Sequence, residues 1–129
     1  NYINWEIVPE AIYNILTRVK RDYGDIEIQI TENGSCALDI VNREKKIVDD
    51  ERIDYMYQHL KQINRAMREG VNVTAYYAFC FTDNLEWALG FTKRFGLVYV
   101  DFKTQERIVK ESGYWYSKVI KDNGFELVD

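Results

Sequence analysis

The chain has 129 residues, 47% of them hydrophobic and 29% charged, which is the composition of one globular domain with a hydrophobic core. Its 17 basic and 21 acidic residues give a net charge of −4, which argues against nucleic acid or an anionic membrane surface as a partner. Aromatic residues make up 15% of the chain. That is more rings than a core of this size needs, so we expect some of them to face a ligand.

The two cysteines, Cys36 and Cys80, lie in no CxxC or Cys/His pattern. We therefore predict neither a disulfide framework nor a zinc site, and expect reduced thiols in a reducing compartment, with the cytoplasm favoured. No apolar run approaches the roughly 20 residues of a membrane-spanning helix, and the first residues do not resemble a signal peptide. We expect no membrane partner.

The first half of the chain predicts a helix, a strand and a long loop. After Pro9, apolar residues recur at spacings of three and four up to Gly24, which indicates an amphipathic helix. Apolar and polar residues then alternate over 26–30, which predicts a strand followed by a turn at 31–34. Residues 35–50 are polar and aperiodic, and a loop of this length tends either to line a site or to be mobile.

The second half begins with another helix, from Asp49 to Gly70, with one apolar stripe. Residues 71–81 form a nearly continuous apolar and aromatic run, which predicts a strand buried on both faces. Residues 97–102 and 107–109 predict the arms of a hairpin, and 114–121 predict a closing helix. Alternating helices and strands indicate an α/β fold with parallel strands.

A parallel sheet of only two buried strands leaves open edges. We therefore expect the chain to pair with another polypeptide or with itself, or to be one part of a larger sheet.

Two polar clusters follow the two predicted strands. Glu32 lies at the end of the first strand, and the segment 82–87, which contains Glu86 and Trp87, follows the second. Because parallel strands end at one edge of the sheet, these clusters should converge, as a binding site requires. A Glu beside a Trp offers hydrogen bonds to hydroxyl groups and an apolar face, the mixture that sugars present. The alternative is an exposed carboxylate next to a structural Trp.

Other polar residues are interpreted as structural. His59, the only histidine, is expected to be a solvated helix residue, and Asp49 and Arg52 to cap and brace the start of their helix. For Tyr76 and Tyr77, in the second strand, we expect a packing role.

Several motifs together resemble those of glycoside hydrolase family 1. They are Ile-Thr-Glu-Asn-Gly at 30–34, Asp-Asn-Leu-Glu-Trp at 83–87 and the run at 93–101, with further similarity at 5–10, 52–55 and 112–116. The family's enzymes are (β/α)8 TIM barrels that cleave β-glycosides with retention. The resemblance implies that residues 1–129 form the carboxyl-terminal part of such a barrel, with its seventh and eighth strands. A complete barrel takes about 250 residues.

The resemblance also implies roles for individual residues. Glu32 corresponds to the catalytic nucleophile, and Glu86 and Trp87 to residues that hydrogen-bond the hydroxyls of the sugar. Phe95 matches an aromatic residue bordering the same subsite. Phe79 takes the place of the family's usual Trp under the sugar ring, as Phe79-Cys80 instead of Trp-Ser, and its smaller ring should stack more weakly. The mechanism requires no metal and no organic cofactor.

The family's acid/base Glu lies in an Asn-Glu-Pro motif that this sequence does not contain. Because general acid catalysis contributes about 10²- to 10⁴-fold, the chain alone should be inactive and should need the remaining strands, expected from a second chain. The Glu86 carboxylate would repel a 6-phosphate, which favours an exo-acting β-glucosidase for unphosphorylated sugars. The alternative is a non-catalytic half-barrel that binds sugar or only assembles.

Overall fold

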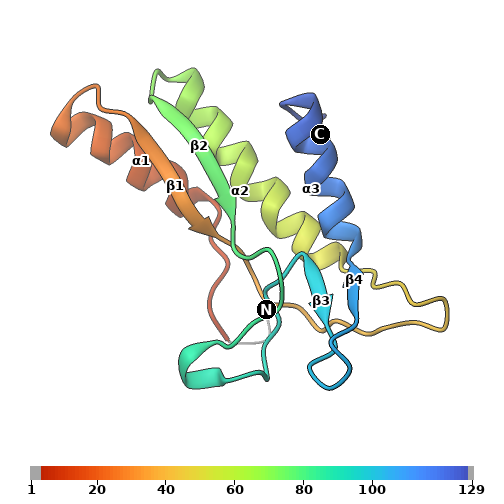
Figure 1. Ribbon diagram of the computed structural model, residues 1–129. Coiled ribbons are helices and arrows are strands. Elements are labelled where there is room, and N and C mark those ends of the chain that lie inside the picture. Colours follow the sequence, from red (N-terminus) through yellow and green to blue (C-terminus); the bar gives the residue numbers. More distant parts are fainter. Residues whose placement is uncertain (1–3, 128–129) are drawn as a thin grey trace.

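The computed structural model describes residues 4–127 of the chain (Figure 1). Residues 1–3 and 128–129, including the first residues considered above for a signal peptide, lie outside this range. No helix between residues 4 and 127 is long and apolar enough to cross a membrane. The elements in chain order are α1 (Glu10–Tyr23), β1 (Ile28–Asn33), α2 (Asp50–Arg68), β2 (Val73–Ala78), the short 3-10 helix η1 (Trp87–Leu89), β3 (Val98–Val100), β4 (Arg107–Val109) and α3 (Glu111–Asp122).

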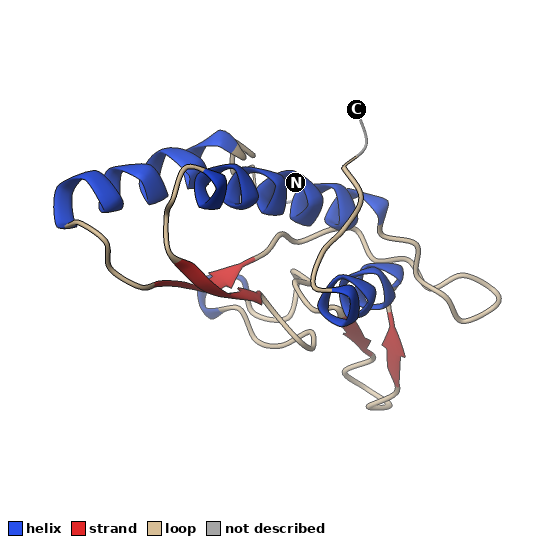
Figure 2. Ribbon diagram, turned by 90° about the horizontal axis from the view of Figure 1, so that it is seen from above, coloured by secondary structure: helices blue, strands red, loops and turns tan. Residues whose placement is uncertain are grey.

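Strands β1 and β2 pair in parallel, as the alternation of helices and strands predicts. Helices α1 and α2 lie side by side over one face of this strand pair (Figure 2). The core between these layers is built by the apolar stripes of both helices and the inward residues of both strands. Its buried members are Leu16, Ile63, Ala66 and Val71.

The prediction that the second strand is buried on both faces is wrong for this chain. The side chain of Tyr77 in β2 is 55% exposed, and Gln29 and Thr74 on the strand pair are also exposed. Within residues 4–127, β1 and β2 pair only with each other, and α1 and α2 pack over one face, where Tyr76 of β2 also meets Tyr116 of α3. The strand is largely apolar on both faces, but the described residues cover only one of them.

Strand β1 is displaced from its predicted position by two or three residues. It begins at Ile28 rather than at residue 26 and runs through Asn33, where the sequence predicts a turn. The parallel pairing explains the extension, because Asn33 still pairs with Ala78 of β2. Glu32 is therefore the second-last residue of β1 and does not lie in a loop.

The predicted hairpin is confirmed as the antiparallel pair β3 and β4. At the start of its turn, the Asp101 carboxylate accepts the backbone N–H groups of Lys103 at 2.8 Å and Thr104 at 3.0 Å. These bonds lower the pKa of Asp101. The chain after β2 runs beside β3, with a parallel bridge between Thr82 and Val98.

Helix α3 begins at Glu111, three residues before its predicted start. Asp49, expected to cap α2, makes no capping hydrogen bond to that helix. Its carboxylate instead accepts the backbone N–H of Ser112 at 2.9 Å and the Ser112 hydroxyl at 2.5 Å, and so caps α3 from a distant part of the chain. Nothing in the local sequence pattern indicates such a long-range cap. The bracing role predicted for Arg52 is confirmed by its ion pair with Asp49.

His59 is structural, as expected, but it is not solvated. Its side chain is 6% exposed, its ring stacks on Tyr55 at 4.0 Å between centroids, and Nδ1 lies 2.7 Å from the Tyr55 carbonyl oxygen. This burial lowers the pKa of His59. The apolar stripe of one helix could not predict this burial, because it depends on how other elements, such as α1, pack against α2.

Candidate active site at the carboxyl end of the strand pair

The carboxyl ends of β1 and β2 lie side by side, so the chain segments that lead to the two predicted clusters leave the sheet at one edge. The backbone N–H of Phe79 donates to the Asn33 carbonyl at 2.9 Å, so the residues after Glu32 and the residues after β2 start from adjacent points. Glu32 itself is exposed. The placement predicted for Glu32, at the carboxyl end of a parallel strand, is thus the one that the fold gives it.

Gly34 allows this close approach of the two chain segments. A Cβ atom at this position would lie 1.6 Å from the Phe79 carbonyl oxygen, closer than any side chain can approach a backbone atom. The glycine of the Ile-Thr-Glu-Asn-Gly motif is therefore required by packing of backbone against backbone. Phe79 itself is followed by a cis peptide bond to Cys80.

Phe79 and Phe95 meet beneath this edge. Their rings make an edge-to-face contact with centroids 5.6 Å apart, in a cluster with Cys36 and Cys80. Phe95 is buried, whereas Phe79 keeps part of its surface open. Both cysteines are free thiols, and burial raises the pKa of Cys80 to about 11, so its sulfur stays protonated at neutral pH.

Glu86 and Trp87 lie on a tight turn. The Glu86 N–H donates to the Gly90 carbonyl at 2.8 Å and the Gly90 N–H donates back to Glu86 at 2.7 Å, which fixes the backbone around η1. The Trp87 side chain is 93% exposed. A large indole is rarely left so open without a partner, which favours a ligand or another part of a larger fold over the structural alternative.

A buried ion cluster holds the loops that carry these residues. Lys110, with no exposed side-chain surface, donates to Asp39 at 2.5 Å and to Asp83 at 2.9 Å. Arg52 bonds Asp39 and Asp49, and Arg94 bonds Asp83 at 2.5 Å. The three carboxylates and three cations cancel in formal charge, and each buried charge has at least one partner of opposite sign, as burial requires.

This cluster ties four segments together: the loop after β1, the start of α2, the segment after β2 and the start of α3. The loop at 35–50, which the sequence leaves between site-lining and mobile, is anchored by it through Asp39 and Asp49. Asp39 and Lys110 were not predicted from the sequence, because acidic residues and lysines in loops are usually solvated. Asp83 was noted in its motif, but no ion pair was predicted for it. Their pairing depends on contacts 71 and 27 residues apart.

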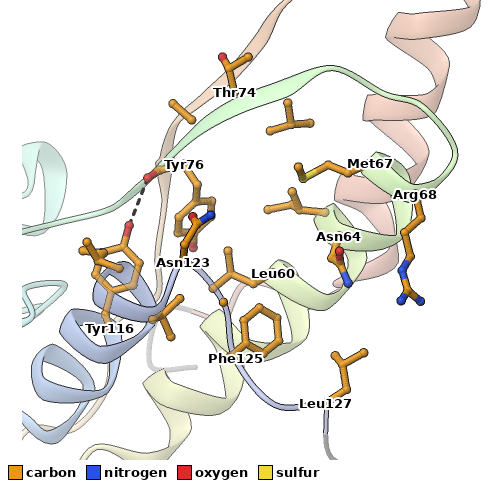
Figure 3. Close-up of a pocket in the computed structure, with 16 residues that line it drawn as sticks. Leu60, Asn64, Met67, Arg68, Thr74, Tyr76, Tyr116, Asn123, Phe125 and Leu127 are labelled. Atoms are coloured by element: carbon orange, nitrogen blue, oxygen red, sulfur yellow. Dashed lines mark hydrogen bonds between the residues drawn. The ribbon is translucent and has the colours of Figure 1, made fainter.

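A wide groove in the described part of the chain lies elsewhere. It has a volume of about 610 Å³ between α2, β2 and α3 (Figure 3), and it is lined by none of the residues predicted for the site. The predicted site is an open edge in this chain, and further segments would be needed to enclose a ligand there.

A parallel strand pair with a carboxylate at the end of one strand and a Glu-Trp pair after the other defines an α/β protein with a candidate carbohydrate site. The family model of glycosyl hydrolase family 1 matches residues 1–125. The chain belongs to this family.

Its relatives include enzymes with different named substrates. Beta-glucosidase A of Thermotoga maritima is 52% identical over 124 residues, which cover 96% of this chain and 28% of that protein. A 6-phospho-beta-galactosidase of Leptotrichia buccalis is 44% identical over 117 residues, covering 90% of this chain and 25% of that protein. The chain thus spans about 28% of the length of the Thermotoga relative.

Solved structures agree with the sequence comparison. A family 1 β-glucosidase from Thermotoga maritima in complex with isofagomine lactam superposes with a TM-score of 0.96 at 51% identity, over 98% of this chain and 29% of that structure. The chain therefore has the backbone of part of a family 1 glycosidase.

Proposed function

We propose that the chain supplies the nucleophile and part of the sugar subsite of a retaining β-glycosidase, as the carboxyl-terminal part of a TIM barrel with its seventh and eighth strands. The observation that carries the proposal is the position of Glu32 at the carboxyl end of β1, beside the end of β2. In barrels of this kind the chemistry lies at that edge. The uncovered face of the strand pair also supports the proposal, because in a barrel this face would line the interior that further strands complete.

In the proposed reaction, the Glu32 carboxylate attacks the anomeric carbon and forms a glycosyl-enzyme, which water then hydrolyses. A second carboxyl group, about 5 to 5.5 Å away, must protonate the leaving oxygen. The sequence lacks the Asn-Glu-Pro motif, so in this proposal that group comes from the remaining strands. Those strands belong either to a longer form of this chain or to a second polypeptide. The 129 residues alone are then inactive.

The sugar subsite is proposed to use Glu86 and Trp87 for hydroxyl groups, with Phe79 and Phe95 as its aromatic border. Glu86 is half-buried, which strengthens its repulsion of a phosphate group. We therefore propose an exo-acting β-glucosidase for unphosphorylated sugars, although the relatives also include 6-phospho-beta-galactosidases.

A chimera tests this proposal. This chain replaces the matching 124 residues of Thermotoga maritima beta-glucosidase A, and the product is assayed with nitrophenyl β-glucoside and its 6-phosphate. We expect hydrolysis of the glucoside in preference to the phosphorylated substrate. Glu32→Gln should lower kcat by more than about 10³-fold, because no other group can form the intermediate.

Glu27→Gln is the matched control, since Glu27 is an exposed carboxylate just before β1, at the opposite end of the strand. It should leave kcat unchanged. A folded chimera without activity would support the non-catalytic half-barrel instead, and activity that survives Glu32→Gln would contradict the assigned nucleophile.

A further inference from the structure

The side-chain amide of Asn33, the residue after Glu32, is held from two sides. The Tyr76 hydroxyl of β2 donates to Oδ1 at 2.9 Å, and Nδ2 donates to the Tyr55 hydroxyl oxygen of α2 at 3.2 Å. Burial raises the pKa of both tyrosines, so both hydroxyls stay protonated over the working range of a glycosidase. The two bonds fix which way the amide faces.

Both tyrosines lie on regular elements and have further partners there. The Tyr55 ring stacks on the buried His59, whose Nδ1 lies 2.7 Å from the Tyr55 carbonyl oxygen. The carbonyl of Tyr76 accepts a hydrogen bond from the Tyr116 hydroxyl of α3 at 3.1 Å (Figure 3). The clamp on Asn33 therefore rests on residues of α2 and β2, and not on a mobile loop. The Tyr116 bond reaches the backbone of Tyr76 and not the hydroxyl that holds Asn33.

The strand is irregular where Glu32 lies. Ile30 pairs with Tyr76 and Asn33 pairs with Ala78, so β1 takes three residue steps where β2 takes two. The additional residue falls at Thr31–Glu32, and both of these side chains are exposed instead of alternating between faces. A bulge of this kind re-aims a side chain but leaves its backbone poorly paired. Asn33 is the first paired residue after it.

We propose that Tyr55 and Tyr76 are positioning residues, which clamp Asn33 and thereby set the direction of the Glu32 carboxylate toward the anomeric carbon. This inference rests on the proposed function. The tyrosine hydroxyls lie on the helix-facing side of the strand and touch Asn33, not the sugar. Loss of the clamp should therefore slow formation of the glycosyl-enzyme and leave sugar binding nearly intact.

The test uses the active chimera with Tyr55→Phe and Tyr76→Phe, each of which removes one hydroxyl and keeps the ring. We expect kcat, and the maximal rate of inactivation by an activated 2-fluoro glucoside, to fall about 10- to 100-fold with little change in KM. Tyr116→Phe is the matched control: it removes a hydroxyl of similar burial that bonds Tyr76 but not Asn33. It should leave kcat unchanged.

A double-mutant cycle separates clamping from general packing. Asn33→Ala removes both hydrogen bonds at once, so adding Tyr55→Phe to Asn33→Ala should cause no further loss of kcat. Additive losses, or losses that Tyr116→Phe reproduces, would overturn the proposal. So would a rise in KM without a change in kcat.

A chimera that is inactive before any of these substitutions would contradict the proposed function, and the clamp is then decided by hydrogen exchange. In the 129-residue chain, Tyr55→Phe and Tyr76→Phe should speed deuterium uptake in peptides covering 31–35, and Tyr116→Phe should not. Equal uptake in all three variants would overturn the clamp.

Discussion

Glu32 and Asn33 are neighbours in the sequence but have opposite surroundings. Glu32 is exposed at the edge of the strand pair, while Asn33 is half-buried and bonded on both sides of its amide. A nucleophilic carboxylate has to be open to its substrate and still held in direction. Under the proposed function, the fixed residue directly after the open one would meet both needs.

At the same scale, His59 gives a pH-dependent prediction. Burial lowers its pKa in the folded chain, and the hydrogen bond to the Tyr55 carbonyl and the negative charge of Glu10 oppose this only in part. The unfolded chain then binds a proton near pH 6.5 more readily than the folded chain. The contribution of neutral His59 to stability is complete above pH 6.5 and is lost as the pH falls from there toward the folded pKa.

The measurement is an NMR titration of the one histidine ring, with urea unfolding between pH 7.5 and about 5 as its companion. We expect a pKa below 6.5 and a decrease in unfolding free energy that is smaller in His59→Gln. A ring that titrates at or above 6.5 would contradict the burial account.

At the scale of elements, charged pairs rather than regular structure hold the site loops. The segments at 34–49 and 79–97 contain few backbone ladders, and Lys110 joins them through Asp39 and Asp83. Lys110→Met removes the cation and leaves both carboxylates buried, so we expect a loss of about 3 to 5 kcal/mol in unfolding free energy.

Lys45→Met is the control for this prediction, because it breaks an exposed ion pair with Glu106 and should cost less than about 1 kcal/mol. Urea unfolding of the two variants, followed by circular dichroism, compares them directly. Equal losses would mean that the cluster contributes no more than a surface pair.

Elements also show what the sequence can and cannot predict. The helices around Leu16 and Ile63 were predictable because each forms a local apolar stripe. The first strand was predictable from its alternation of apolar and polar residues, and the second from its apolar run. The bulge before Asn33 and the cap of Asp49 on α3 were not, because both depend on a partner far along the chain. The positions of Glu32 and Glu86 could be predicted from the motifs and from the order of the strands. The ion cluster that supports their loops could be predicted from neither.

At the scale of the whole molecule, the chain is part of a family 1 fold with an open sheet and an open site. Trp87 and Tyr77 are both exposed, and under the proposed function these side chains are covered by further strands or by a ligand. We expect activity to require the further strands of the proposed barrel, with the nucleophile supplied by this chain.

The most direct measurement is the site of covalent labelling in the active chimera. An activated 2-fluoro glucoside should form a stable ester, and mass spectrometry of the digested protein should locate it on Glu32, with no label in Glu32→Gln. A label on any other residue of an active chimera would contradict the central claim that this chain carries the nucleophile at the end of β1.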